Sequence, residues 1–420
     1  MHSSHQGGTI KQSWSKQRRR DGMRSRWAAT VIAGGLIATM TVPGQTAGLS
    51  VFTDPLIEEL STSRTAISLS YLIGTLVGAA CQPLIGKASD RWDIRRVIIG
   101  IAVAFSAILF GLSFITDMLG LTIGFVGVRM AGQGALSLAA TTAISRAITH
   151  RRGLALGVSA ALGSAGISLA PIGLERLITT VDIQGAWRWE ALAVLAIVIP
   201  AAFFIKTPPS RKGLSKHWTP ERGWTLAEAR RTGMLWVLSA AVAVSSMLTT
   251  ALAFHQIALL GERGLSPLEA AANFLPQTIT TLLATLVVGA LIDRADPRIF
   301  VIAAMAAMSA ALLLVGVVTP GWSAVFYGLV LGTAGGCLRG MEAATFARFY
   351  GVKHIGAIRG LSTAFSLGAS ALGPYMLALG VELDGGFTTP TALLSAIPVI
   401  VIIATVIVRP PTHSDGVRPQ

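Results

Sequence analysis

Four ionisable side chains lie within or at the end of long apolar stretches, and their types suggest anion binding and proton transfer. Arg129 and Arg339 are candidate anion-binding residues, because a planar guanidinium matches a carboxylate with two parallel hydrogen bonds. Glu342 is the one carboxylate that we expect deep within such a stretch, and His255 has an imidazole that titrates near neutral pH. Glu342 and His255 are therefore the candidate proton carriers.

Each of these residues also has a structural interpretation. A buried arginine can serve only to pair with a carboxylate or with backbone carbonyls. Glu342 follows Arg339 by one helical turn on the same helix face, which makes it the expected partner of Arg339. His255 can equally be a packing residue whose hydrogen bonds are satisfied inside the protein.

Polar residues near a backbone break form a second group of candidates. The segment Pro43–Gly48 interrupts the first apolar stretch, and its proline frees a backbone carbonyl. We expect Gln45, Thr46, Tyr71 and Gln133 to line a substrate cavity. Small residues nearby also permit tight helix crossings.

The sequence contains no motif for catalysis, metal binding or nucleotide binding. Cys81 and Cys337 lie in apolar stretches without partner spacing, and no nucleotide-binding loop or nucleophile constellation is present. We therefore expect no catalytic residue, no metal and no cofactor. An ion gradient is the expected energy source.

The elements that must position these residues are membrane-spanning helices. Of the 420 residues, 52% are hydrophobic and 13% are charged, whereas a soluble domain carries about 25% charged residues. A helix needs roughly 20 consecutive apolar residues to cross a bilayer. Twelve stretches fit this length: 27–51, 65–85, 97–116, 119–145, 154–175, 188–206, 233–260, 268–292, 299–318, 322–346, 355–379 and 389–408. The expected class is an all-α integral membrane protein.

Charge predicts the orientation of these helices. If the N-terminus lies inside the cell, the cytoplasmic segments collect nearly all basic residues, and the outer segments hold only Arg64, Arg176, Arg188 and Arg263. An even number of spans places the C-terminus in the cytoplasm as well. The net charge of +14 then indicates attraction to anionic lipid and no nucleic-acid partner.

The spans are expected to form two six-helix bundles. The segments Gly86–Arg91 and Gly289–Arg294 share a Gly-x-x-x-Asp-Arg pattern at equivalent loops, which indicates a duplication. Substrate sites in such duplicated folds lie near the midplane between the bundles. The predicted parts are a basic tail (1–26), an N-terminal bundle (27–206), a cytoplasmic loop (207–232), a C-terminal bundle (233–409) and a second tail (410–420).

These features resemble the major facilitator superfamily. The segment from Gly86 to Arg96 follows the family's loop signature and departs from it at Ala88, Asp93 and Ile94. The segment Arg129-Met-Ala-Gly-Gln-Gly134 is similar to a second family motif. The resemblance implies the major facilitator fold in a multi-pass protein of the cell inner membrane, with a small-molecule substrate and a monomeric state.

The resemblance also implies a latch between the bundles on the cytoplasmic side. The glycines would let a helix end approach its neighbour closely, and the aspartates would accept hydrogen bonds from the start of span eleven or span five. The alternative is an ordinary turn with positive-inside charges. The residues concerned are Gly86, Asp90, Arg91, Gly289, Asp293 and Arg294.

Two stretches are similar to the bacterial monocarboxylate-porter and oxalate/formate-type branch. The first is Pro43–Phe52 running into Ser63–Tyr71, and the second is Tyr350–Gly360. The similarity implies secondary active transport of a small organic anion, by symport with a proton or by exchange for a counter-anion. That branch commonly carries an aspartate and an arginine in span eight, where this chain has only Asn273 and Gln277, so Arg129 or Arg339 would take the anion-binding role.

Two other functions remain open. The first alternative is proton-coupled efflux of drugs or of a pathway metabolite. Residues Ala170–Leu174 match the glycine-proline motif of such antiporters only in a degraded form. The second alternative, a membrane enzyme or sensor without transport, finds no supporting motif.

Overall fold

The computed structural model describes residues 27–148, 152–205, 224–292, 294–351 and 354–411, and within them it contains helices and no strands. A helix over residues 27–39 comes first. The following elements of the first half are η1 (Val42–Gly44), α2 (Thr46–Glu59), α3 (Arg64–Arg91), α4 (Ile94–Leu112), α5 (Met118–Val128), the π-helix η2 (Arg129–Leu136), α6 (Ser137–Ala147) and α7 (Arg152–Phe204). Those of the second half are α8 (Leu226–Ala229), α9 (Gly233–Phe254), α10 (Gln256–Gly261), α11 (Pro267–Ala272), α12 (Phe274–Leu291), α13 (Pro297–Leu314), α14 (Trp322–Tyr350), α15 (Ile355–Asp384), α16 (Thr388–Leu394) and α17 (Ala396–Ile407).

The number of membrane crossings follows from the length of α7. Eleven helical segments among the described residues are long and apolar enough to span a bilayer, and one of them, Leu154–Phe204, has 51 residues. At about 1.5 Å per residue, a straight helix of that length would be more than twice as long as a hydrocarbon core of about 30 Å is thick. Asp182 interrupts it with a φ of 59° and a ψ of 175°, which are not helical angles. We therefore count two crossings in α7 and twelve within the described residues, the number that the sequence predicts.

The first crossing is longer than expected and is broken in its middle. The sequence predicts a span over 27–51, whereas the helical segment runs from Trp27 to Glu59. Pro43 lies in the short 3₁₀ turn η1, and Gln45 has extended backbone angles of −89° and 152°. Proline has no N–H to donate, so the α-helical hydrogen bonds stop here and resume in α2.

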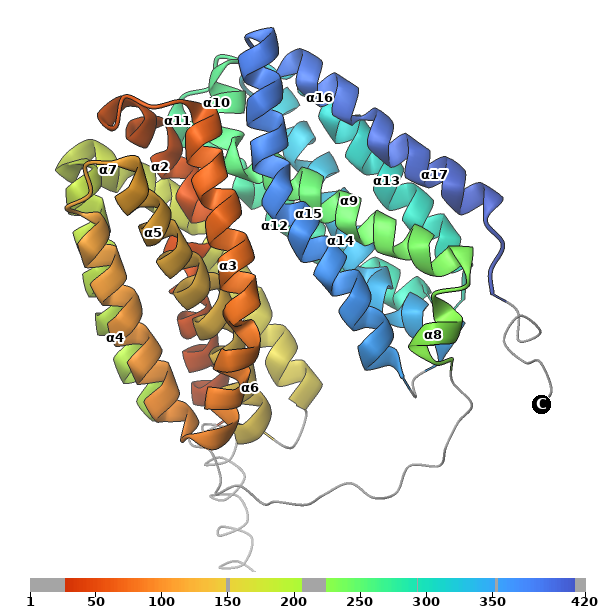
Figure 1. Cartoon of the computed structure of the whole chain (residues 1–420), viewed down its shortest axis with the longest axis horizontal. Coiled ribbons are helices and arrows are strands. Elements are labelled where there is room, and N and C mark those ends of the chain that lie inside the picture. Colours follow the sequence, from red (N-terminus) through yellow and green to blue (C-terminus); the bar gives the residue numbers. More distant parts are fainter. Residues whose placement is uncertain (1–26, 149–151, 206–223, 293, 352–353, 412–420) are drawn as a thin grey trace, which may run out of the picture.

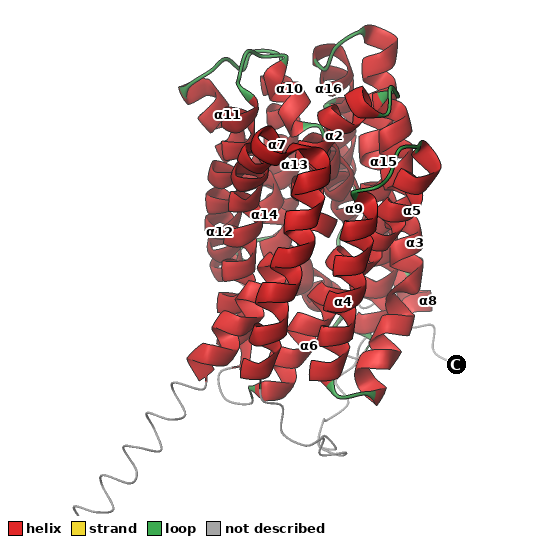
Figure 2. Cartoon of the chain, turned by 90° about the vertical axis from the view of Figure 1, so that its left-hand side faces the viewer, coloured by secondary structure: helices red, strands yellow, loops and turns green. Residues whose placement is uncertain are grey.

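The helices form two groups that stand side by side (Figure 1). The helices from α2 to α7 make up one group and those from α9 to α17 the other. The view in Figure 2 shows the helices running lengthwise from one end of the molecule to the other. The first group packs around one large apolar core, which includes a stacked pair between Phe52 and Trp187. The second group packs around two apolar clusters.

The two groups meet at the end that carries the turn between α2 and α3, which we call the Arg64 end; the opposite end, with the turn between α3 and α4, is the Arg95 end. In Figure 1 the groups lie close together at the top, which is the Arg64 end, and diverge toward the bottom. The backbone N–H of Thr65 on α3 donates to Oε1 of Glu382 on α15 at 3.2 Å. The Tyr71 and Phe254 rings pack at 4.5 Å between centroids. The orientation of these ends in the membrane stays a prediction.

Candidate functional site

A polar cavity of about 380 Å³ lies midway along the molecule, between the two groups of helices. Its walls come from η2 of the first group and from α9, α14 and α15 of the second. Hydroxyl, amide and charged side chains dominate the lining, although each belongs to a helix apolar enough to cross a membrane. The polar lining residues are Gln133, Ser245, Ser246, Thr249, Thr250, Arg339, Glu342, Thr363, Ser366 and Ser370.

Arg339 presents a free cation to this cavity. It lies seventeen residues into the 29-residue helix α14, well away from either helix end. Its side chain is nevertheless exposed, because it lines the cavity. In the part of the chain that the structure describes, no hydrogen bond or ion pair reaches its guanidinium. The structure thus leaves this cation available for an anionic ligand.

Glu342 forms an ion pair with a residue that the sequence interpretation did not consider. Its Oε1 accepts a hydrogen bond from Nη2 of Arg359 on α15 at 3.3 Å. The prediction that Glu342 pairs with Arg339 is therefore wrong. The two side chains share a helix face, but the guanidinium of Arg359 reaches the carboxylate across the α14–α15 interface.

The hydroxyl groups of the cavity wall are only partly paired with one another. Ser246 on α9 and Ser366 on α15 share a hydrogen bond of 2.6 Å between their Oγ atoms. The Oγ1 atom of Thr249 is buried and has no hydrogen-bond partner. A buried hydroxyl without a partner carries a desolvation cost of about 1–3 kcal/mol, which a ligand atom in the cavity would offset.

Arg129 lies outside the cavity, locked into the first group of helices. Its side chain is 2% exposed. Its Nε donates to Oγ1 of Thr75 at 3.0 Å, and its Nη1 donates to the carbonyl of Gly44 at 2.9 Å. The guanidinium also stacks on the Tyr71 ring, with Cζ 4.5 Å from the ring centroid. These contacts support the structural interpretation of Arg129, in which the guanidinium satisfies a carbonyl left free by the break at Pro43.

The polar candidates of the first group divide between the cavity and the protein interior. Gln133 lines the cavity. Tyr71 is fully buried, and its Oη shares a hydrogen bond of 2.7 Å with Oγ1 of Thr46. Gln45 donates from its Nε2 to Oγ1 of Thr41 within the same helix break. Gln45, Thr46 and Tyr71 thus support the backbone break and the ring beneath Arg129, and their contact with substrate stays a prediction.

His255 is a packing residue in this structure. Its side chain is 1% exposed and lies between the rings of Phe254 and Phe387. Its Nε2 lies 2.9 Å from the carbonyl oxygen of Pro374, while its Nδ1 is buried without a partner. His255 is not among the cavity-lining residues, whereas Glu342 is, and a proton-carrying role for either residue stays a prediction.

The sequence interpretation did not identify a carboxyl group that is buried within the first group of helices. Glu190 on α7 is 7% exposed, and its Oε2 is buried without a hydrogen-bond partner. Glu190 is the third residue of the predicted span 188–206, and a residue so near the start of a span is expected at the membrane surface. The signal that could have placed it inside is its helical spacing with Trp187 and Val194, which are buried on the same face.

The predicted latch can be compared with the structure at only some of its positions. Asp293 lies outside the described residues, as do the surroundings of Gly86 and the side chains of Asp90 and Arg91. A Cβ built at Gly289 would meet no atom within 4 Å in this conformation, in which the two groups diverge at the Arg95 end, so the close approach expected of the closed latch stays a prediction. Arg294 is exposed at the end of α12.

Comparison with known proteins agrees with the fold. The family model described as "Major Facilitator Superfamily" matches residues 35–374. The Escherichia coli (strain K12) protein named "Uncharacterized MFS-type transporter YhjX" is 28% identical over 230 residues, which are 51% of this chain and 53% of that protein. The "MFS-type transporter hasB" of Aspergillus fumigatus is 26% identical over 221 residues, 51% of this chain and 48% of that protein. The matches therefore span about half the length of these relatives.

Two crystal structures of a bacterial homologue of the human lysosomal transporter Spinster share the architecture. The inward-facing, occupied structure has a TM-score of 0.71 at 18% identity and covers 93% of this chain and 98% of the other. The inward-facing, unoccupied structure has a TM-score of 0.72 at 17% identity and covers 94% and 99%. Such low identity shows the fold alone, and the resemblance to the monocarboxylate-porter branch stays a prediction. The family model matches well over half of the 420 residues, so this chain belongs to the major facilitator superfamily of transporters.

Proposed function

We propose that this protein moves a small organic anion across the membrane by alternating access and that Arg339 binds the anion. The observation that carries the proposal is the unpaired guanidinium of Arg339 in the cavity between the two groups of helices. An ionised side chain near the centre of a membrane-spanning helix costs at least about 2.5–3.5 kcal/mol. An anionic ligand in the cavity offsets this cost, and a planar carboxylate matches the two N–H groups on one edge of the guanidinium.

The charges around the cavity favour a ligand with one negative charge. Glu342 and Arg359 balance each other in their ion pair. The positive charge of Arg339 is then the surplus. The seven serine and threonine residues of the lining offer hydrogen bonds to the uncharged part of such a ligand. These features support a small, polar monocarboxylate.

Arg339→Gln is expected to remove the response to carboxylates while leaving the fold intact. Gln keeps a polar side chain on the cavity wall and loses the charge and the planar fork. The purified wild-type protein should melt at a higher temperature in small monocarboxylates such as lactate, glycolate or acetate. At a ligand concentration of 100 times the Kd, binding stabilises the native state by about 2.7 kcal/mol. We expect Arg339→Gln to lose this shift and to lose carboxylate uptake into proteoliposomes.

The control for this experiment is Arg409→Gln, which removes an exposed arginine beyond the end of α17. It should keep the full carboxylate response. Tetraphenylphosphonium, a lipophilic cation, tests the alternative of drug efflux. A melting shift with this cation and none with the carboxylates would replace the anion-porter proposal by efflux. A full carboxylate shift in Arg339→Gln would remove Arg339 from the binding site.

Glu342 is the proton carrier in this proposal. Protonation of its carboxylate removes the acceptor that holds Arg359, so a second guanidinium becomes available to the anion. Carboxylate binding to the wild-type protein should therefore tighten as the pH falls. Glu342→Gln mimics the protonated state, and we expect it to bind tightly at every pH tested.

Titration calorimetry at mildly acidic and mildly alkaline pH measures this difference. A matched variant, Glu190→Gln, changes a buried carboxyl group that does not line the cavity and should keep the wild-type pH dependence. An unchanged pH dependence in Glu342→Gln would exclude Glu342 as the coupling group, and the anion-binding role of Arg339 would stand or fall separately.

A further inference from the structure

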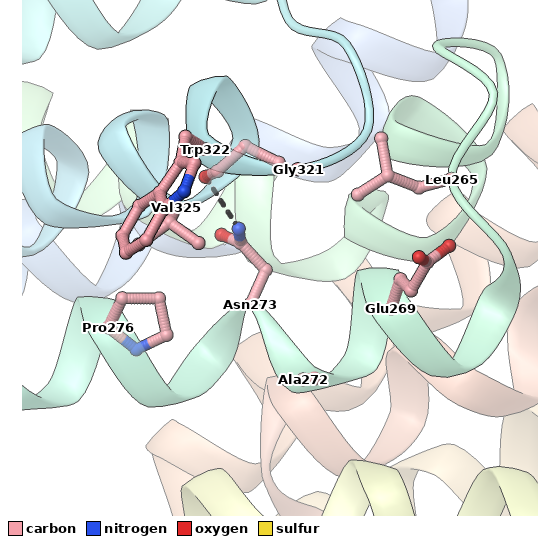
Figure 3. Close-up of a pocket in the computed structure, with 9 residues that line it drawn as sticks. Leu265, Glu269, Ala272, Asn273, Pro276, Gly321, Trp322 and Val325 are labelled. Carbon is pink, nitrogen blue, oxygen red and sulfur yellow. Dashed lines mark hydrogen bonds between the residues drawn. The ribbon is translucent and has the colours of Figure 1, made fainter.

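A second pocket lies at the Arg64 end, apart from the central cavity. It has a volume of about 360 Å³ and is formed by α11, α12 and the first turn of α14. Glu269 and Asn273 rise from the same side of the α11–α12 ribbon, with Gly321 and Trp322 beyond Asn273 and Leu265 beyond Glu269 (Figure 3). The pocket combines a carboxylate, an indole ring and an apolar floor.

The pocket lies where two membrane-spanning segments begin. The crossing Pro267–Leu291 starts at one side of it, and the crossing Trp322–Tyr350 starts at the other. Trp322 is 84% exposed, although tryptophan is a large aromatic residue. Exposed tryptophans gather at the headgroup level of a bilayer, where the ring meets the apolar region and the indole N–H meets polar groups. The pocket therefore lies at the depth of lipid headgroups.

Glu269 brings a negative charge to the pocket, and only one of its two carboxylate oxygens accepts hydrogen bonds from the part of the protein that the structure describes. Its Oε2 accepts hydrogen bonds from the backbone N–H and from Oγ of Ser266, at 2.8 and 2.7 Å, and these bonds cap α11. Among the described residues, no hydrogen bond reaches its Oε1, and no lysine or arginine forms an ion pair with it. The carboxylate thus lines the pocket with one oxygen that is free to accept a further hydrogen bond.

An apolar stripe leads from the pocket into the membrane. Pro276 lines the pocket, and Ile279, Leu283 and Leu286 follow it at helical spacing on α12. Their side chains are 56%, 56% and 70% exposed. The crossing that carries them, Pro267–Leu291, has the smallest buried share among the spans found in the described residues, at 22%. This stripe fits acyl chains.

We propose that this pocket binds the headgroup of an aminophospholipid, such as phosphatidylethanolamine. The primary ammonium donates to Glu269, the phosphate accepts from the indole N–H of Trp322, and the acyl chains lie along the stripe on α12. A primary ammonium suits the site better than a quaternary one, because it carries N–H donors for the carboxylate. A lipid without a cation, such as phosphatidylglycerol, leaves the Glu269 charge unpaired.

Glu269→Gln is the variant that tests this site. Glutamine at the third helical position keeps the capping box, so α11 retains its start while the charge is lost. The matched control is Glu228→Gln, because Thr225 and Glu228 form the same capping box at the start of α8, far from the pocket. Each full-length variant is placed in nanodiscs containing phosphatidylglycerol with increasing shares of phosphatidylethanolamine or phosphatidylcholine, and the retained lipid is measured by native mass spectrometry.

The wild type and Glu228→Gln should retain phosphatidylethanolamine in preference to both other lipids. We expect Glu269→Gln to reduce that preference about tenfold, because the substitution removes the charge that pairs with the ammonium. Trp322→Leu should weaken retention of phosphatidylethanolamine through the lost phosphate contact. Equal retention by Glu269→Gln and wild type would overturn the proposal, as would an equal loss in Glu228→Gln. Release of the lipid by free O-phosphoethanolamine at millimolar concentration would replace the lipid by a soluble ligand.

Discussion

Arg129→Ala is expected to destabilise the protein by on the order of 3 kcal/mol, before any effect on substrate is considered. The substitution leaves the Gly44 carbonyl and the Thr75 hydroxyl without their donor in a region closed to water. It also removes the guanidinium that covers the Tyr71 ring. The break between η1 and α2 then loses its main side-chain support. Thermal melting in detergent, without ligand, measures the effect.

Arg129 and Arg339 are expected to have different roles, the first in stability and the second in anion binding, and their variants should differ accordingly. Arg339→Gln should melt like the wild type without ligand and lose the carboxylate response, whereas Arg129→Ala should melt earlier with or without ligand. Arg129→Lys should recover part of the stability, because an ammonium can satisfy one acceptor but cannot reproduce the fork. An Arg129→Ala protein with wild-type stability and no carboxylate response would instead place the anion at Arg129.

Gly373→Ala is expected to separate α9 from α15 and to destabilise the second group of helices by roughly 3 kcal/mol. A Cβ at position 373 would lie 2.1 Å from the carbonyl oxygen of Met247 on α9, and backbone atoms cannot swing aside as a side chain can. The same two helices carry Ser246 and Ser366, whose hydrogen bond joins them across the cavity wall. The carboxylate response should therefore fall together with the melting temperature.

Gly368→Ala on the same helix is the control for this prediction. A Cβ at position 368 would meet no atom within 4 Å. Alanine is favoured over glycine inside a helix by about 1 kcal/mol, so this variant should melt at the wild-type temperature or slightly above it. Equal melting temperatures for the two variants would show that the α9–α15 crossing tolerates a wider spacing.

The sequence predicts the membrane-spanning helices well because each of them must present an apolar surface to the hydrocarbon core of the bilayer. Apolar stretches of about 20 residues are sufficient to locate the crossings. The boundary between the fifth and sixth crossings was also visible in the sequence, since both predicted spans avoid Asp182. Pro43 predicts the break at Val42–Gln45. The predicted span ends at residue 51, however, whereas the helix continues to Glu59. Hydropathy does not report how far a helix extends into water.

The cavity was harder to predict because it depends on contacts between helices. Spacing along one helix places Glu342 beside Arg339, yet the structure pairs it with Arg359 from another helix. Spacing cannot rank a local partner against a distant one, because the distance across a helix interface depends on the packing. The same reason explains Arg129, whose acceptors at Thr75 and Gly44 come from two other segments.

The contacts at the Arg64 end have a consequence for the resting distribution of conformers. The Thr65–Glu382 hydrogen bond, the stacking of Arg64 on Phe387 and the Tyr71–Phe254 ring pair must all separate before that end can open. Contacts of these kinds are worth about 0.5–1.5 kcal/mol each. Their sum holds the end shut by a factor of about ten to a thousand. A bias of this size keeps the unloaded molecule from opening often, yet a ligand that binds the open form about ten-thousandfold more tightly would reverse it.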